Sequence, residues 1–141
     1  MKPLRHAIAY AIYHPDRTQI LLVQRPFDDP NLPGVWGLPA GGVYDHETFE
    51  EAVHRSGLEK LGVELAIASF IRRGAIERAD YVLNMEEFEV VIRRGEPSVP
   101  QPFPAVTQYA AWKWGLPDEL QDAASKGSLC SRLFLFSQPV G

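Results

Sequence analysis

The sequence predicts a layered fold of the α/β class. Apolar stretches typical of strands lie on both sides of one central helix, which is expected over residues 49–61. A second helix is expected late in the chain, from residue 117, and no internal repeat or linker interrupts the sequence. Together these observations indicate helices on both faces of a mixed β-sheet, an α-β-α sandwich formed by a single domain over residues 1–141.

The composition limits the classes of partner. Apolar residues make up 45% and charged residues 23% of the chain, which is typical of a globular protein. The net charge is −4 with both signs interspersed, so we expect no nucleic acid polymer as a partner, whereas a small phosphorylated ligand is compatible with this balance.

The cysteine content and the N-terminus indicate a cytoplasmic protein. A single cysteine, Cys130, cannot form an internal disulfide, and we expect it to be a buried structural thiol in a reducing compartment. The N-terminal apolar run carries Lys2, Arg5 and His6 and is too short for a secretion signal or a membrane span, so no membrane partner is expected.

Two strands are expected before the central helix. Residues 6–13 favour a strand, residues 14–17 form a turn, and residues 19–24 form a second strand, so we expect the two to pair as a hairpin. The continuous apolar run of the second strand predicts that it is covered on both faces. Arg25 follows directly after it.

A glycine-rich turn and a capped helix come next. Residues 26–35 hold three prolines and a glycine and are expected to form a loop, followed by a short strand at 36–38 and a turn at 39–42. Thr48 and Glu51 have the spacing of a capping box, which predicts a helix beginning near Phe49. Gly62 stands where that helix would end.

The second half of the chain is expected to contain three strands and a helix. We predict strands at 65–72 and 107–114, one long or two broken strands at 81–93, a turn near Gly74, and an irregular segment at 97–104, which holds four prolines. A helix is expected from Pro117 to between Ala124 and Lys126, with Gly127 after its end. Residues 129–136 are compatible with a short helix or a strand.

The spacing around the central helix resembles the Nudix box, the signature of the Nudix hydrolase family. The pattern requires Gly, five residues, Glu, seven residues, and then Arg-Glu-aliphatic-x-Glu-Glu-x-Gly-aliphatic. Six of its nine defined positions are matched, by Gly41, Glu47, Arg55, Glu59, Gly62 and Val63, and the flanking residues 36–39 (WGLP) are also typical of the family. The other three positions depart from the pattern, with Ser56 and Lys60 in place of Glu and Gly57 in place of an aliphatic residue.

The resemblance implies a fold, a reaction and a site. The fold would be the Nudix α-β-α sandwich, and the reaction would be hydrolysis of a phosphoanhydride in a nucleoside diphosphate linked to another moiety, with Mg²⁺ or Mn²⁺ as cofactor. Glu59 and the backbone carbonyl of Ala40 would bind the metal, and Arg55 would pair with Glu47 to orient the loop. Gly41 and Gly42 would shape the loop, and Arg25 would meet the phosphates, although a surface ion pair is an equal alternative for Arg25.

The departures change the charge of the expected metal site. Three glutamates give the family pattern a charge of −3 at positions 56, 59 and 60, whereas Ser56, Glu59 and Lys60 together carry no net charge. A further family ligand often precedes the last strand, but residues 104–109 contain no acidic side chain. Because hard divalent cations require oxygen ligands, we expect weakened metal binding.

Two hypotheses follow for the site. In the first, an active hydrolase uses a rearranged set of carboxylates drawn from residues 47, 50, 51, 59, 87 and 89. In the second, the Lys60 ammonium stands where the metal would, and the domain binds a phosphorylated ligand without cleaving it. A simpler alternative is that Glu51, Arg55 and Glu59 are solvated ion pairs on one helix face, in a scaffold that binds a partner.

Gly57 predicts a local irregularity in the central helix. Glycine inside a helix costs about 1 kcal/mol relative to alanine and removes an apolar side chain that the family buries. We therefore expect either that a neighbouring bulky side chain fills the space or that the helix bends at Ser56–Gly57.

Overall fold

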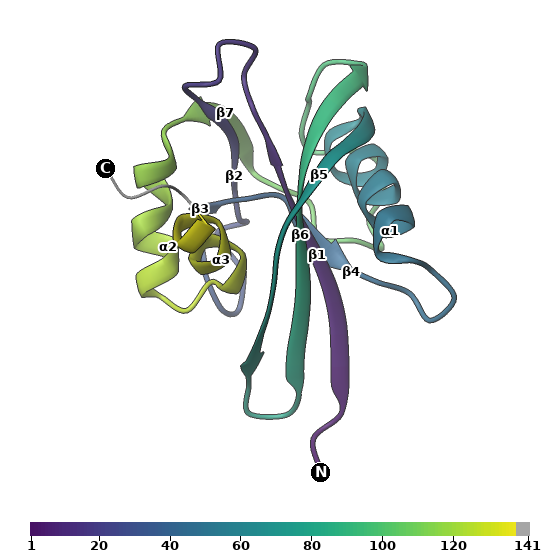
Figure 1. Ribbon diagram of the computed structural model, residues 1–141, viewed down its shortest axis with the longest axis vertical. Helices are drawn as coiled ribbons and strands as arrows, with labels where there is room; N and C mark the ends of the chain where they lie inside the picture. Colours follow the sequence, from purple (N-terminus) through teal and green to yellow (C-terminus); the bar gives the residue numbers. More distant parts are fainter. Residues whose placement is uncertain (138–141) are drawn as a thin grey trace.

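Two β-sheets form the centre of the molecule, and helices lie on both sides of them (Figure 1). The computed structural model describes residues 1–137. The first sheet has four strands in the order β4-β1-β6-β5, in which β1 and β6 are parallel and the other pairs antiparallel. Its strands are β1 (Leu4–Ile12), β4 (Ala40–Gly42), β5 (Glu64–Glu77) and β6 (Val82–Arg94).

The second sheet and the helices complete the layers. This sheet is antiparallel, in the order β3-β2-β7, and consists of β2 (Ile20–Gln24), β3 (Trp36–Gly37) and β7 (Ala111–Gly115). Helix α1 (Phe49–Ser56) lies on one side of the sheets, whereas α2 (Gln121–Ser125) and α3 (Leu129–Ser137) lie on the other (Figure 1). The predicted mixed α-β-α layering is confirmed, with the sheet layer divided in two.

The alternation along β1 divides the hydrophobic core between the two sides. The bulky residues Ile8, Tyr10 and Ile12 belong to the cluster that contains Ala52 and Val53 of α1. The intervening residues Ala7, Ala9 and Ala11 instead belong to the cluster that contains Leu129 and Phe134 of α3. Successive side chains of a strand point to opposite faces, so this single strand anchors both helical layers.

The expected pairing of the first two strands as a hairpin is wrong. Both edges of β1 are already taken by β4 and β6, and β2 lies in the other sheet between β3 and β7. Only an isolated bridge, between Tyr13 and Ile20, remains of the expected ladder. The prediction that β2 is covered on both faces is confirmed, because residues 20–23 are all buried.

Three other elements differ from expectation. The glycine-rich turn includes a strand, β4, which pairs with residues 7–9 of β1. No turn occurs at Gly74, since β5 continues to Glu77 and the chain turns at residues 78–81. Glycine at position 74 allows the Leu133 side chain to pack against the strand, because a Cβ there would lie 2.5 Å from Leu133 Cδ2. The last strand begins at Ala111 rather than at residue 107.

The late segments settle the open alternatives. The segment predicted at 81–93 forms one long strand, β6 (Val82–Arg94). The segment at 129–136 forms helix α3 (Leu129–Ser137), whose residues Leu133 and Phe134 are buried. Residues 97–104 have no regular structure, as their prolines predict. A 3₁₀ turn, Pro117–Leu120, leads into α2, and Gly127 after it has a φ of 98°.

Helix α1 has the predicted start and an irregular end. Thr48 and Glu51 form the capping box, and the helix changes at Gly57 into a π-helical turn, Gly57–Leu61. A Cβ on Gly57 would lie 2.6 Å from Leu65 Cδ1, so the Leu65 side chain fills the space that glycine leaves. Gly62 ends the segment with a φ of 71°.

Within residues 1–137, no helix combines the length and the apolarity needed to cross a membrane.

Cys130 is buried and carries a free thiol, and burial raises the pKa of this thiol.

Glu87 is an uncompensated buried carboxyl group in the middle of β6. The residue is 0% exposed, and neither carboxyl oxygen has a hydrogen-bond partner among the described residues. Burial raises its pKa to about 9, so the group is neutral near pH 7 in the folded protein and ionised in the unfolded chain.

Replacing Glu87 with methionine should therefore stabilise the protein, increasingly so at higher pH. The folded wild type holds a proton that the unfolded chain releases, so its stability falls as pH rises from the ordinary value towards 9. We expect the advantage of Glu87→Met to grow by on the order of 2 kcal/mol between pH 5 and 7, as measured by urea unfolding. Glu77→Gln, at an exposed position, is the control. If the free energies of unfolding of Glu87→Met and of the wild type changed with pH in parallel, the interpretation would be contradicted.

Gly57→Ala should destabilise the protein although alanine favours helices. The added methyl group would collide with Leu65, and overpacking of this kind costs about 1–3 kcal/mol. The matched control is Gly42→Ala, because a Cβ there meets nothing within 4 Å. Equal urea midpoints for the two variants would show that Leu65 does not fill the position of the missing side chain.

Candidate functional site

The glycine-rich loop is held by β1 at one end. Ala40 pairs with Ala9, and Tyr10 donates its backbone N–H to the Pro39 carbonyl over 3.1 Å. This pairing fixes the backbone of residues 39–42 against the sheet, and the Ala40 carbonyl lies where Lys60 can reach it.

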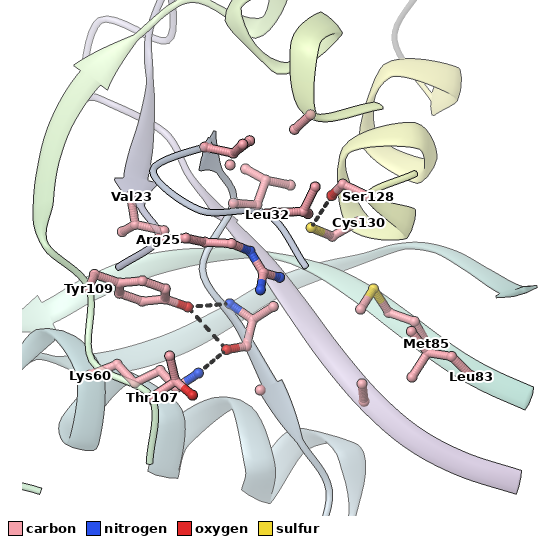
Figure 2. A pocket seen from close by; sticks show the side chains of 17 residues that line it. Val23, Arg25, Leu32, Lys60, Leu83, Met85, Thr107, Tyr109, Ser128 and Cys130 are labelled. Atoms are coloured by element: carbon pink, nitrogen blue, oxygen red, sulfur yellow. Dashed lines mark hydrogen bonds between the residues drawn. The ribbon is translucent and has the colours of Figure 1, made fainter. Parts of the chain in front are cut away.

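The Ala40 carbonyl is bonded by two side chains from other segments. The Lys60 ammonium donates to it over 2.5 Å, and the Tyr109 hydroxyl donates to it over 3.1 Å (Figure 2). The same hydroxyl accepts from the Ala40 N–H at 3.0 Å. The Lys60 ammonium also lies 5.2 Å from the centroid of the Tyr109 ring, within range of a cation–π contact. The carbonyl that the resemblance assigned to a metal thus faces a protein cation.

Ser56 lies beside the loop and is hydrogen-bonded to Tyr10. Its hydroxyl and that of Tyr10 lie 2.9 Å apart, both residues are buried, and burial raises the pKa of Tyr10 above its ordinary value. A Cβ on Gly41 would lie 3.4 Å from Ser56 Oγ and 3.8 Å from Lys60 Nζ. A Cβ here would therefore make ordinary van der Waals contact with both side chains.

Arg55 connects the loop to the helix. Its guanidinium donates to Glu47 over 2.7 and 2.9 Å, to the Gly42 carbonyl over 2.7 Å and to Glu59 over 3.1 Å. It also stacks 3.8 Å from the centroid of the Tyr44 ring. The hydrogen bonds from Arg55 are the largest cause of a lowered pKa for Glu47, and in return they raise the pKa of Arg55. The pairing of Arg55 with Glu47 that the resemblance implies is present.

A pocket of about 230 Å³ opens beside the loop, and two cationic side chains line it. Lys60 reaches it from the end of the helix, and Arg25 from the end of β2 (Figure 2). The remaining lining is mostly apolar, from the residues Val23, Leu32, Val35, Leu38, Leu83 and Met85, with Tyr109 and Cys130 beside them. Arg25 is also ion-paired with Asp29 at 3.1 Å, so both alternatives for Arg25 are compatible with its position.

A second cavity, of about 550 Å³, adjoins this pocket, and Arg25 lines both. The two share Arg25, Leu32, Met85 and Cys130, and the second adds Arg78, Asp80, Tyr81 and Lys126. Together the two cavities are lined by the cationic side chains Arg25, Lys60, Arg78 and Lys126 and by apolar residues that include Leu32, Leu83 and Met85.

The residues of the site do not fit a divalent cation. Of the three positions that carry glutamate in the family pattern, Lys60 is a cation, Ser56 is bonded to Tyr10, and Glu59 is paired with Arg55. Across residues 1–137, no group of three His, Cys, Asp or Glu side chains could hold a metal ion. Magnesium and manganese require several oxygen ligands, which this arrangement does not offer.

The rearranged set of carboxylates is not brought together either. Glu51 closes the capping box, Glu50 is exposed, and Glu47 is paired with Arg55. Glu87 is buried in the sheet, and Glu89 is paired with Arg17 at 3.2 Å. This hypothesis therefore has no support in the geometry.

The structure divides the predicted site residues between a pocket and a separate hydrogen-bond network, and it adds two residues that sequence analysis did not select. Gly41, Ala40, Lys60 and Arg25 line one pocket, whereas Gly42 joins the separate Arg55 network with Glu47 and Glu59. Tyr10 and Tyr109 were missed. The only signal for Tyr10 is its place in the alternation of β1, and Tyr109 lies in the stretch that was searched for an acidic ligand.

Comparisons with known proteins agree on one family. The sequence profile of the NUDIX domain matches residues 3–133. Among solved structures, a MutT NUDIX hydrolase from Burkholderia pseudomallei is 28% identical, with a TM-score of 0.69, over 83% of this chain and 86% of that chain. A NUDIX hydrolase from Nitrosomonas europaea is 17% identical, with a TM-score of 0.73, over 95% and 87% of the two chains.

A third similar structure is an ADP-ribose pyrophosphatase from Streptococcus suis 89-1591. It is 18% identical, with a TM-score of 0.60, over 81% of this chain and 75% of that chain. At this identity the likeness concerns the fold. Among curated proteins, none matches this chain significantly.

Arg55→Lys should destabilise the loop and the protein. Lysine cannot reproduce the fork of bonds to Glu47, the Gly42 carbonyl and Glu59, and we expect a loss of about 2–3 kcal/mol in urea unfolding. Amide exchange of residues 42–47 should also become faster. Arg17→Lys is the control, because Arg17 makes a two-bond pair with Glu89 at the surface. A loss for Arg55→Lys no larger than that of the control would contradict the role given to the network.

Proposed function

The chain belongs to the NUDIX domain family, and from this membership we propose that it binds a nucleoside diphosphate linked to another moiety in the glycine-loop pocket. We expect hydrolysis of the phosphoanhydride to be slow, because the positions of the expected metal ligands are occupied by other interactions. The observation that carries this proposal is the presence of two cations, Arg25 and Lys60, in one pocket beside the loop.

The two cations suit a diphosphate. Arginine binds phosphate oxygens through a planar fork of donors, and lysine binds them as a compact charge. Arg25 and Lys60 come from elements 35 residues apart in sequence, yet both reach the same pocket. In this proposal they neutralise the negative charges of the diphosphate, while Gly41 keeps the loop free of side chains that would obstruct it.

The rest of the cleft suits the groups attached to the diphosphate. The aliphatic wall of Leu83 and Met85 offers apolar contact to a nucleoside or to the second moiety. The adjoining cavity provides Asp80 and Arg78 as polar partners for hydroxyl groups. The ADP-ribose pyrophosphatase among the similar structures is named for a ligand of this chemical class. A small nucleotide rather than a nucleic acid polymer is therefore the proposed partner.

Hydrolysis is the second candidate function, and one observation favours it. Glu59, Arg55 and Glu47 are connected as the family resemblance implies, so part of the proposed catalytic set is in place. In that case Arg55 and Glu47 would hold the loop, and Glu59 would be the catalytic carboxylate. The lack of a fitting metal site makes this function the weaker candidate, because the reaction implied by the resemblance requires a cation at the phosphates.

The test is a panel of ligands measured for both binding and turnover. ADP-ribose, UDP-glucose, ADP and inorganic pyrophosphate are titrated into the protein by calorimetry, with and without Mg²⁺ or Mn²⁺, and product release is followed in parallel. Binding with little turnover supports the proposal, whereas metal-dependent turnover comparable to binding supports the hydrolase. Neither binding nor turnover would refute both and would favour a scaffold that binds a protein partner.

Arg25→Gln should weaken binding of the best ligand of the panel by about tenfold or more, because a charge-assisted bond to phosphate is lost. Arg17→Gln is the matched control, since Arg17 lies at the surface and does not line the pocket. An unchanged affinity for Arg25→Gln would assign Arg25 to its ion pair with Asp29 instead.

A further inference from the structure

We propose that the Lys60 ammonium group takes the place of a divalent cation in the phosphate site, and that the site binds the diphosphate in its metal-free form. The inference rests on the proposed function and adds the ionic form of the ligand and its regulation: free Mg²⁺ antagonises binding instead of supporting it.

The position of the Lys60 ammonium is the first step. It donates to the Ala40 carbonyl over 2.5 Å and lines the pocket that also holds Arg25. An ammonium group has three N–H donors, and the carbonyl accepts one of them. No other hydrogen bond from Lys60 occurs among the described residues, so donors remain for oxygens of a bound phosphate.

The surroundings keep Lys60 at this position. The Tyr109 hydroxyl bonds both the N–H and the carbonyl of Ala40, so the acceptor is fixed in place before any ligand arrives. The Tyr109 ring is 5.2 Å from the ammonium, and it adds a favourable cation–π contact. A side chain held in this way loses little conformational entropy on binding, which favours affinity.

A divalent ion would have to displace this cation. It would compete with Lys60 for the Ala40 carbonyl, and a like charge nearby would repel it. The other two positions of the pattern offer no replacement ligands, since Ser56 is buried against Tyr10 and Glu59 is held by Arg55. The site therefore excludes the ion for two separate reasons, charge and lack of ligands.

The same geometry selects the form of the ligand. In solution, Mg²⁺ is bound by the phosphate oxygens of nucleotides. A diphosphate that carries Mg²⁺ has its charge already neutralised and brings a cation towards Lys60 and Arg25. The metal-free diphosphate presents its full negative charge to both side chains. Added Mg²⁺ should therefore lower the apparent affinity by removing free ligand.

The first experiment measures binding of ADP-ribose and of inorganic pyrophosphate to the full chain by calorimetry, in EDTA and in millimolar Mg²⁺. We expect binding in EDTA and affinity several-fold weaker in Mg²⁺. Binding that occurs only in Mg²⁺ would overturn the inference and leave the proposed function intact. The absence of binding in both conditions would overturn the inference together with the proposed function.

The second experiment measures Mn²⁺ binding directly, without any nucleotide. The wild type should bind no Mn²⁺ at the site, and the double variant Ser56→Glu/Lys60→Glu, which removes the cation and adds two carboxylates near the Ala40 carbonyl, should gain Mn²⁺ binding. Lys60→Gln should weaken ADP-ribose binding in EDTA by about tenfold or more. Lys113→Gln is the matched control, because Lys113 is ion-paired with Glu119 at 2.8 Å and does not line the pocket.

Circular dichroism and urea midpoints establish that each variant is folded before binding is compared. Mn²⁺ binding to the wild type at the Ala40 carbonyl, detected as paramagnetic broadening of the neighbouring Gly41 amide signal, would overturn the inference. So would a failure of the folded Ser56→Glu/Lys60→Glu double variant to gain Mn²⁺ binding, since charge and missing ligands would then not be what keep the ion out.

Discussion

The hydrogen bond between the Lys60 ammonium and the Ala40 carbonyl is the interaction on which the site depends. It joins the end of the helical segment to the strand β4, which is itself paired with β1. Tyr109 bonds the same peptide group from the segment before β7. Three parts of the chain that are distant in sequence therefore meet at one backbone carbonyl, and a positive charge is built into their meeting point.

Compared with the family pattern, the site keeps the glycine loop and the capped helix, but Lys60 places a positive charge where the pattern has a carboxylate. The helix cap and the Arg55 network with Glu47 and Glu59 involve no hydrogen bond from Lys60. The serine below the loop is satisfied by Tyr10, so the loss of a carboxylate at that position leaves no unpaired buried group. Relative to the family pattern, the charge of the pocket is what differs, because Lys60 stands in place of a glutamate.

Local signals in the sequence predicted some parts of the structure well. The capping box at Thr48, the glycine at the end of the helix and the consequence of Gly57 depend on neighbours close in sequence or on backbone geometry. The pairing of Arg55 with Glu47, which the family resemblance implied, also lies within one local loop and helix. These features required no knowledge of how distant strands are arranged.

Features set by long-range pairing were predicted poorly. The expected hairpin of β1 and β2 failed because β6, which follows 70 residues later, takes the edge of β1. Gly74 was assigned to a turn because the sequence does not reveal that Leu133 packs over it. Tyr10 and Tyr109 reach the site from opposite ends of the chain, and nothing near either residue in sequence marks it as a site residue. Such contacts follow from strand order, which periodicity alone does not determine.

The most direct measurement is an anomalous-scattering map from crystals grown with Mn²⁺. The account predicts no manganese peak beside the Ala40 carbonyl and predicts density for the Lys60 ammonium within hydrogen-bond distance of that oxygen. A manganese peak about 2.2 Å from the Ala40 oxygen, with Lys60 turned away into solvent, would contradict it.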